Sequence, residues 1–389
     1  MFNRSRKGTF GAAGIAATCV KTAEEVEALC EAWDALAARD ATATTYQGSA
    51  WLATWFRHHP NVRPRVFVAF RGDRLTAAIP LCAYRARFQL ASTRILRLAA
   101  DNDSDYGNAL VDPEHPGDLA ELVGAGLLRS RTWDLLDLRH IPASASLAQA
   151  VRAASGPSRI HHVAQDVAPY LDIRSEWQAS VSRNQRSQVL RHRRQLEAEG
   201  PVAFDVARSA DEVVGMLDQF ARIHIARWRQ RGETSVFCIP TQRAWLHAAC
   251  QALHQRGELY LCRLALAGNP VSMGLYVLSG RRLTNYMIAF QEEYRRFGPA
   301  HLLIAAAIED VRRRNLADIH DFGRGGEEYK LRWTRATQPL ERILVARRSL
   351  AGSAALCWAA RVQPFIWRHY RAATLLREFR RRREARRSA

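Results

Sequence analysis

Hydrophobic and polar positions along the chain predict helices followed by strands. Residues 22–39 carry an apolar side chain at every third or fourth position, which predicts an amphipathic helix, and residues 49–58 predict a second helix rich in aromatic residues. Two apolar runs, 64–70 and 75–84, then predict strands. The sequence Arg-Gly-Asp-Arg at 71–74 lies between them and is typical of a hairpin turn.

The same order of elements occurs twice. In each part of the chain, a hairpin is followed by a strand, a loop, a helix and another strand. In the second part these elements are residues 257–278, 283–290, 291–299, 300–314 and 317–322. The pattern repeats although the residues do not. It indicates two copies of one α/β (α+β) unit, each with a mixed central sheet flanked by helices.

The intervening and final segments predict how the chain is divided. Residues 140–170 are rich in Ala, Ser, Pro and Gly and are interpreted as a connection. A basic helix over 174–199 and another helix over 210–231 lead into the second unit. We expect an N-terminal domain at 1–165, a C-terminal domain at 166–345, and a basic helical tail at 346–389 that is disordered at its tip.

The charge of the chain favours an anionic partner. Its 389 residues contain 57 Lys and Arg against 38 Asp and Glu, and ten of the arginines fall within residues 361–389. Candidate partners are a nucleotide cofactor, a nucleotide-sugar, RNA, or an anionic membrane contacted by this Arg-rich tail. The alternative is a solvated tail in an arginine-rich chain. Only three lysines occur, so Lys330 stands out as a compact donor or base.

Cysteine spacing and hydropathy bear on the location of the protein. Seven cysteines occur without C-x-x-C or histidine at metal-ligand spacing, and they are interpreted as buried thiols in a reducing compartment. No apolar run reaches the length of a membrane span, and the N-terminal stretch is too weakly apolar for a signal peptide. We expect a cytoplasmic protein without a bound metal, in which the tail can contact a membrane peripherally.

The loop after residue 290 carries the clearest binding pattern. Arg295-x-x-Gly298-x-Ala300 lies between a strand and the start of a helix, where backbone N–H groups and the helix dipole favour an anion. A pyrophosphate such as that of coenzyme A fits this pattern. Pro299 has no N–H to donate, so the loop offers fewer amides than usual. The residues expected to bind the cofactor are Arg295, Arg296, Phe297, Gly298, Pro299 and Ala300.

The corresponding loop of the first unit is acidic. Its three carboxylates, at Asp101, Asp103 and Asp105, would repel a pyrophosphate, so the second unit is expected to bind the cofactor and the first to shape the substrate cleft. Asp105 and Tyr106 are candidates for holding an amine or a sugar hydroxyl, and a solvated turn is the alternative. The match to a calcium-binding loop is poor, because the glycine is displaced and a strand follows.

A glycine-rich segment at residues 321–333 follows the last predicted strand. Asp321 ends that strand, at the sheet edge where ligands of open α/β sheets gather. The glycines that follow allow close backbone approach, and Lys330 adds a single lysine to this polar stretch. For Asp321 and Lys330 together, a functional role is favoured over a surface turn.

The chain resembles the CelD/BcsL-type group of GNAT acetyltransferases, which are kin to the Fem-type peptidyltransferases with two GNAT-like domains. The resemblance covers roughly residues 20–345. The residues that carry it are Trp51 to Trp55, Ile79-Pro80-Leu81, Ser104-Asp105-Tyr106, Ser182-Arg183-Asn184 with Arg186-Ser187, His224 with Arg227-Trp228, Tyr294 to Ala300, and Asp321 to Trp333. It implies two GNAT folds, acetyl-CoA or a related acyl donor, and a link to exopolysaccharide or cellulose synthesis.

The predicted reaction is direct acyl transfer to an amine or a sugar hydroxyl, on a sugar or nucleotide-sugar acceptor. Asp321 is the candidate base, Tyr286 or Tyr294 would protonate the leaving thiolate, and Lys330 would orient the acceptor or balance negative charge. A backbone N–H of the strand at 283–290 would hold the oxyanion. The candidates for binding the acceptor or a cofactor phosphate are Asp105, Tyr106, Arg183, Asn184 and Trp228; Trp228 also fits a core position.

Two further hypotheses stay open. The basic surface is compatible with a Fem-like transfer of an amino acid from aminoacyl-tRNA, which predicts strongly salt-dependent tRNA binding. The chain can also be a non-catalytic module of a polysaccharide-synthesis complex, held at a membrane by residues 361–389. Acyl-CoA turnover would exclude this last hypothesis.

Overall fold

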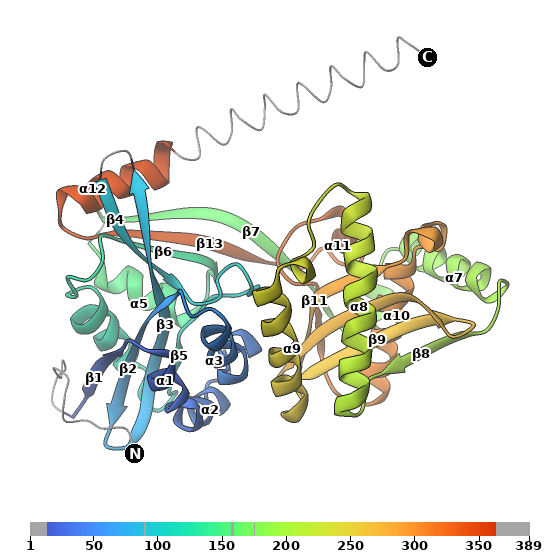
Figure 1. Cartoon of the computed structure of the whole chain (residues 1–389), viewed down its shortest axis with the longest axis horizontal. Helices are drawn as coiled ribbons and strands as arrows, with labels where there is room; N and C mark the ends of the chain where they lie inside the picture. The colour runs from blue at the N-terminus through green and yellow to red at the C-terminus, as the bar shows by residue number, and fades with distance from the viewer. Residues whose placement is uncertain (1–13, 89–90, 157–158, 175, 363–389) are drawn as a thin grey trace, which may run out of the picture.

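The computed structural model describes residues 14–88, 91–156, 159–174 and 176–362. Figure 1 shows two α/β halves side by side, with two long strands running between them. The predicted α/β architecture with mixed sheets and flanking helices is confirmed.

The first half contains the elements up to the long strand β7. Its strands are β1 (Ala16–Val20), β2 (Arg63–Arg71), β3 (Arg74–Phe88), β4 (Ala91–Leu98), β5 (Leu110–Val111), β6 (Leu135–Pro142) and β7 (Ile160–Asp172). Its helices are α1 (Ala23–Glu27), α2 (Cys30–Arg39), α3 (Ser49–His58), α4 (Gly117–Glu121) and α5 (Ser146–Ala154), with short helical turns η2 (Thr45–Gln47) and η3 (Leu122–Leu127).

The second half repeats this order. Its strands are β8 (Val202–Val206), β9 (Leu259–Leu266), β10 (Asn269–Ser279), β11 (Arg282–Phe290), β12 (Ile319–Asp321) and β13 (Thr337–Ala346). Its helices are α6 (Trp177–Ser180), α7 (Arg183–Glu197), α8 (Ala210–Gln230), α9 (Pro240–Gln255), α10 (Pro299–Arg313), α11 (Glu328–Leu331) and α12 (Leu350–Cys357), with η5 (Val236–Cys238), η6 (Glu292–Phe297) and η7 (Trp358–Val362).

The two halves exchange their last strands. The sheet order is β1-β2-β3-β4-β6-β13-β7-β12-β11-β10-β9-β8, with β5 beside β3. Strand β7 follows the first half in sequence but pairs with β12 of the second, whereas β13 follows the second half and pairs with β6 of the first. β7 and β13 also pair with each other over most of their length. The two sheets are thereby joined into one.

Helices cover both faces of this joined sheet. Helices α3 and α9 pack against each other where the halves meet, and the rings of Trp51 and Trp245 lie 4.9 Å apart, edge to face. On the opposite face, α4 and α5 cover the first half and α10 covers the second. Helix α12 returns to the first half and packs against β4, β6 and β13.

Local sequence explains where the helices begin. Ser209 and Glu212 form a capping box at the start of α8, and Ser182 accepts a hydrogen bond from the backbone N–H of Gln185 in α7. Helix α10 starts with Pro299, directly after Gly298 in the left-handed conformation. These caps fix the ends of the helices that border the candidate site.

Most predicted elements are confirmed, and three predictions need correction. Residues 140–170 are not a connection, because they form α5 and most of β7; alanine, which suggested a loop there, is the best helix former. Helix α9 and strand β13 were not predicted. The cysteines are free, as expected, but Cys238 and Cys357 are exposed and are not buried thiols.

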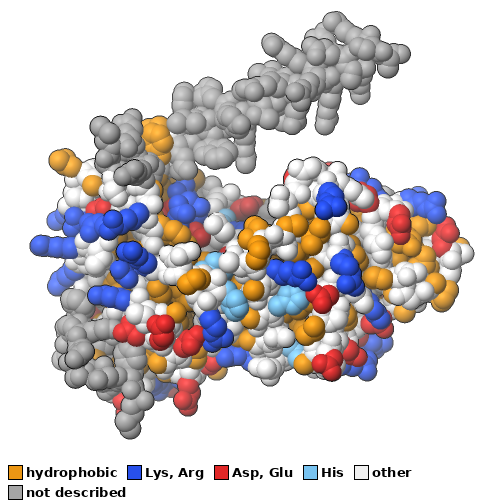
Figure 2. All heavy atoms as spheres, viewed as in Figure 1, with side chains coloured by type: hydrophobic (Ala, Val, Ile, Leu, Met, Phe, Trp, Pro, Cys, Tyr) orange, Lys and Arg blue, Asp and Glu red, His pale blue; other side chains and the backbone are white. Residues whose placement is uncertain are grey.

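The structure bears on the proposed division of the chain as well. A boundary at residue 165 falls inside β7, and β13 lies within the sheet of the first half, so a linear division separates paired strands. The predicted disorder at the tip of the tail concerns residues outside the described part. Within the described part, no helix is long and apolar enough to cross a membrane. Figure 2 shows Lys and Arg side chains on both halves of one face.

The strand exchange places Asp137 of β6 next to Arg342 of β13, which donates hydrogen bonds to its carboxylate. The carboxylate also accepts hydrogen bonds from Arg97 and Arg139. Burial by itself would raise the pKa of Asp137, but the hydrogen bonds and charges of Arg342 and Arg139 lower it to about 2.

We predict that Asp137→Asn destabilises the fold by about 3 kcal/mol at neutral pH, since three guanidinium groups lose their shared carboxylate. The lowered pKa means that this contribution is present above pH 4 and is lost as the pH falls towards 2. Urea unfolding at several pH values measures both effects. Glu309→Gln, on the exposed surface of α10, is the control and should change stability by less than about 0.5 kcal/mol. An equal stability of Asp137→Asn and Glu309→Gln would contradict the prediction.

Candidate active site

The parallel strands β11 and β12 separate after a short pairing. They pair only between residues 282–284 and 319–321. Beyond Thr284, no strand in the described part of the chain pairs with β11 on this side. Backbone groups of residues 285–290 on this edge are therefore not paired with a strand in the described part of the chain, at the carboxyl ends where ligands of open α/β sheets bind.

Asp321 lies at the point where the strands separate. Its Oδ1 accepts hydrogen bonds from the Tyr106 hydroxyl at 2.6 Å and from the Gly323 N–H at 2.9 Å, and its Oδ2 pairs with Arg282 at 2.8 Å. The side chain is only 1% exposed. Three donors hold this buried carboxylate, so the geometry favours a positioning role for Asp321 over the predicted role of base.

Asp105 occupies a different environment. Its Oδ2 accepts a hydrogen bond from the Tyr46 hydroxyl at 2.8 Å, and the Arg324 guanidinium lies 3.7 Å from its Oδ1. Burial raises the pKa of Asp105 to about 6, against the opposing influence of Arg324 and Tyr46. The side chain remains 13% exposed. A carboxyl group with a pKa near neutrality and access to solvent is suited to accept a proton.

The acidic loop at 101–107 and the glycine-rich segment at 321–330 interlock. The Arg324 guanidinium donates to the carbonyl oxygens of Asp101 and Asn102 in the acidic loop. Lys330 donates to the Arg324 carbonyl oxygen at 2.5 Å and pairs with Glu327 at 2.9 Å. Lys330 is buried, so its charge stabilises the turn that presents Arg324 to Asp105.

The tyrosines named from the sequence lie on opposite sides of the sheet. Tyr286 packs against Tyr46 and Trp51 beside the acidic loop, and burial followed by the charges of Asp103 and Asp105 raises its pKa. Tyr294 lies in η6 and packs against the cluster that contains α10. Only Tyr286 is therefore adjacent to Asp105.

The predicted cofactor loop is largely occupied by its own contacts. Arg295 pairs with Glu292, Arg296 pairs with Glu199, and Phe297 is buried. The imidazole of His192 in α7 lies so close to Gly298 that a Cβ there would meet its Nδ1 at 2.7 Å. Helix α7 thus covers the start of α10, where the sequence pattern places a pyrophosphate.

The remaining candidates are spread over two helices. Arg183 and Asn184 begin α7 and are exposed, whereas Trp228 stacks on His224 near the end of α8. Asp112, part of the calcium-like pattern, has both carboxylate oxygens engaged by Arg39 and Arg74, although Glu114 and His115 lie near it.

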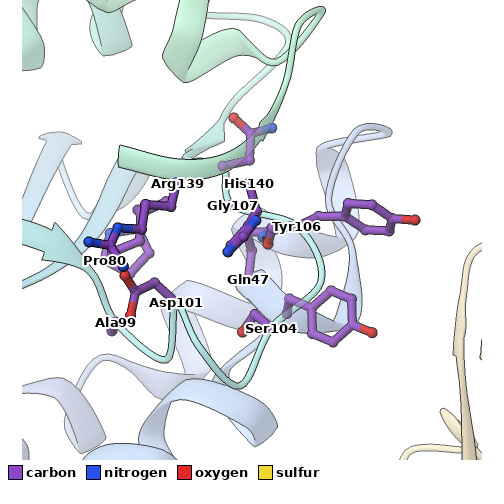
Figure 3. A pocket seen from close by; sticks show the side chains of 12 residues that line it. Gln47, Pro80, Ala99, Asp101, Ser104, Tyr106, Gly107, Arg139 and His140 are labelled. Carbon is purple, nitrogen blue, oxygen red and sulfur yellow. Dashed lines mark hydrogen bonds between the residues drawn. The ribbon is translucent and has the colours of Figure 1, made fainter. Parts of the chain in front are cut away.

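A small cavity lies behind the acidic loop. Figure 3 shows Asp101 and Arg139 on its wall and the Tyr106 side chain pointing away from them. Its volume is about 10 Å³, which is room for about one water molecule and too little for a substrate. Asp321, which accepts a hydrogen bond from Tyr106, does not line this cavity.

Sequence reasoning missed Tyr46, Arg282 and Arg324 as site residues. Arg324 lies within the singled-out segment 321–333, so its position was a usable signal. Tyr46 and Arg282 carry no motif, and only the tertiary contacts with Asp105 and Asp321 identify them.

Comparison with known proteins bears on the fold of the chain. Residues 183–331 match the family described as "Acetyltransferase (GNAT) domain". This segment has a GNAT fold. Its β11, η6 and α10 contain the predicted cofactor loop, and its carboxyl end contains Lys330. No curated protein matches the chain significantly.

Solved structures with a similar fold extend over most of the chain. A crystal structure of FemX has 12% identity and a TM-score of 0.58, and the match covers 84% of this chain and 96% of the FemX chain. The C-terminal domain of a protein named as a lysylphosphatidylglycerol synthetase of Agrobacterium fabrum has 12% identity and a TM-score of 0.54, with 86% and 96% coverage. L-PGS from Bacillus licheniformis has 12% identity and a TM-score of 0.52, with 84% and 95% coverage. These likenesses concern the fold, which is that of tandem GNAT-like units.

We predict that Gly323→Ala disrupts the contact between the two loops. Gly323 has a φ of +70°, and an added Cβ would lie 2.9 Å from both the Asn285 carbonyl oxygen and Asp105 Oδ2. The expected loss is about 1–3 kcal/mol of unfolding free energy. Gly215→Ala, in the open interior of α8, should instead stabilise by up to about 1 kcal/mol. Thermal unfolding distinguishes the two, and equal midpoints would contradict the prediction.

Proposed function

We propose that the protein is an acyltransferase that acts where β11 and β12 separate. The observation that carries this proposal is Asp105, a partly exposed carboxyl group with a pKa of about 6 beside an unpaired strand edge. An acyl transfer to an amine needs a group that removes a proton from the acceptor, and a donor that holds the developing oxyanion. Asp105 and the backbone of residues 285–290 supply these two functions.

The proposed reaction proceeds by direct attack of the acceptor on the acyl carbonyl. Asp105 takes the proton from the acceptor amine, directly or through a water molecule. A backbone N–H of β11 donates to the carbonyl oxygen as it becomes negative. Tyr286, which packs beside the acidic loop, is better placed than Tyr294 to return a proton to the leaving group. Lys330 and Arg324 hold the carboxylate of Asp105 in position.

The finer assignment is N-acetyl transfer from acetyl-CoA to an amine, or to a hydroxyl, of a sugar or nucleotide-sugar. A groove of about 820 Å³ lies between the halves at the amino-terminal ends of β11 and β12, and Asp105 is not among the residues that line it. It reaches Tyr106 and Asp321 and is lined by arginine and carboxylate side chains, including Arg174, Arg256 and Glu258. The link to cellulose or exopolysaccharide synthesis rests on the sequence resemblance alone.

A second candidate donor is aminoacyl-tRNA. The observation that favours it is helix α7, which presents Arg183, Arg186, Arg191, Arg193 and Arg194 to solvent. Within the described residues only Arg193 of these forms an ion pair, with Glu197. An exposed row of unpaired arginines beside the acyl-donor loop is suited to a nucleic-acid backbone. Salt-dependent tRNA binding, lost on replacing these arginines by glutamine, would identify this donor.

We predict that Asp105→Asn reduces kcat/KM for acyl transfer by at least about 100-fold, the usual contribution of a general base. Only the carboxylate form accepts a proton, so wild-type kcat/KM should rise with pH through about 6 and then level off. The measurement is a pH profile with acetyl-CoA and a panel of amine and sugar acceptors.

Asp103→Asn is the matched control, because Asp103 lies in the same loop but accepts a hydrogen bond from Trp55. It should keep the inflection near pH 6. Full activity of Asp105→Asn would overturn the assignment of the base. No turnover by the wild type with acyl-CoA or aminoacyl-tRNA donors would overturn the proposed function and favour a non-catalytic module.

A further inference from the structure

A second cavity lies beside the predicted cofactor loop. It has a volume of about 510 Å³ and is enclosed by the carboxyl-terminal part of α8, the end of β11 and the first residues after it. Amide, guanidinium and aromatic side chains form its walls, together with two acidic residues, Glu293 and Glu292, of which Glu292 pairs with Arg295. Those that matter here are Gln219, Arg222, Arg227, Gln230, Phe290 and Gln291.

Arg227 is a half-buried cation that forms no direct ion pair within the described residues, although the charge of Glu292 acts on it. Its guanidinium lies 3.8 Å from the centre of the Phe290 ring, and its Nε is buried without a hydrogen-bond partner. No carboxylate of the described chain forms an ion pair with it. Burial, followed by the charge of the neighbouring Arg231, lowers the pKa of Arg227. A cation held in this way gains most from an anionic ligand, because desolvation is already complete at Nε.

The cofactor loop itself offers little free positive charge. Arg295 and Arg296 are paired with Glu292 and Glu199, and Pro299 removes one backbone donor. His192 fills the space over Gly298. An anion that approaches this end of β11 therefore meets its strongest unpaired contact on the α8 side of the loop, at Arg227.

The charges of Arg227 and of the candidate base act on one common residue, Tyr329. The phenol of Tyr329 in α11 is within electrostatic reach of both Arg227 and Asp105. Tyr329 also contacts the ring of His301 near the start of α10.

We infer that the α8 cavity binds the phosphate-bearing nucleotide of the acyl donor, with Arg227 as its anion contact. This inference rests on the proposed function, because it presumes an acyl donor. The shared chemistry is an adenosine that carries phosphate, in a molecule that also carries the acyl group. Two donors contain it, namely acyl-coenzyme A and the 3′ end of aminoacyl-tRNA. The glutamine side chains and Phe290 suit a nucleotide, since they offer hydrogen bonds and an aromatic surface.

The test is calorimetric titration of the full chain with adenosine 3′,5′-bisphosphate, acetyl-CoA and aminoacyl-tRNA. Arg227→Gln should weaken binding of the bisphosphate, and of whichever donor is used, by about tenfold or more, because a charge-assisted hydrogen bond to phosphate is lost. Arg227→Lys keeps the charge and should retain part of the affinity. Arg229→Gln, on the same helix but outside the cavity, should bind like the wild type.

The outcomes separate this inference from the proposed function. Weaker binding of acetyl-CoA by Arg227→Gln supports nucleotide binding in the cavity, with coenzyme A as the donor. Weaker binding of aminoacyl-tRNA alone supports it with aminoacyl-tRNA as the donor. Wild-type affinity in Arg227→Gln, together with measurable acyl transfer, overturns the inference while the function stands. Failure of the wild type to bind any of the three probes overturns it as well. Equal losses in Arg227→Gln and Arg229→Gln would also overturn it, since they indicate general charge attraction.

Discussion

The candidate site depends on the contact between the acidic loop at 101–107 and the glycine-rich segment at 321–330. One buried carboxylate in each partner makes this contact specific. Asp321 receives the Tyr106 hydroxyl from the first half, and Asp105 receives the backbone and guanidinium of Arg324 from the second. Each half therefore supplies hydrogen-bond partners to a carboxylate of the other.

The two carboxylates show how environment separates residues of one type. Asp321 has Arg282 and two hydrogen-bond donors and is almost fully buried, so its oxygens are engaged. Asp105 has a more distant guanidinium, so burial raises its pKa to about 6, and its side chain remains partly exposed. Pairs of carboxyl groups with opposed environments are a common way to divide holding and proton transfer between two residues.

Local patterns predicted much of this fold, but long-range pairing was beyond them. The hairpins, the strand at 283–290 and the helix after Gly298 follow from apolar runs and turn residues, and they are found as predicted. Strand β13 and the exchange with β7 could not be recognised, because a strand partner lies almost two hundred residues away in sequence. Composition was misleading at 140–170, where alanine and serine belong to α5 and not to a loop.

The site, like the fold, was predicted only as far as local patterns reveal it. Both loops were identified because glycine and clustered carboxylates are unusual locally. Which aspartate is engaged and which is accessible depends on Arg282, Arg324 and Tyr46, which are brought there from three different elements. The free charge of Arg227 was equally hidden, since an arginine in a chain with so many gives no signal until its lack of a partner is seen.

The exchange of β7 and β13 suggests how such a molecule can arise from a smaller one. A single half that ends in an exchanged strand leaves a gap beside its own β6 or β12, and a second copy can fill that gap with the same strand. Two separate chains would then form a symmetric pair that depends on concentration. Joining them into one polypeptide makes the pairing intramolecular, so it persists at any dilution. It also frees each copy to change on its own. The acidic loop at 101–107 and the loop at 291–299, which has two glutamates and two arginines, show how far the two have diverged.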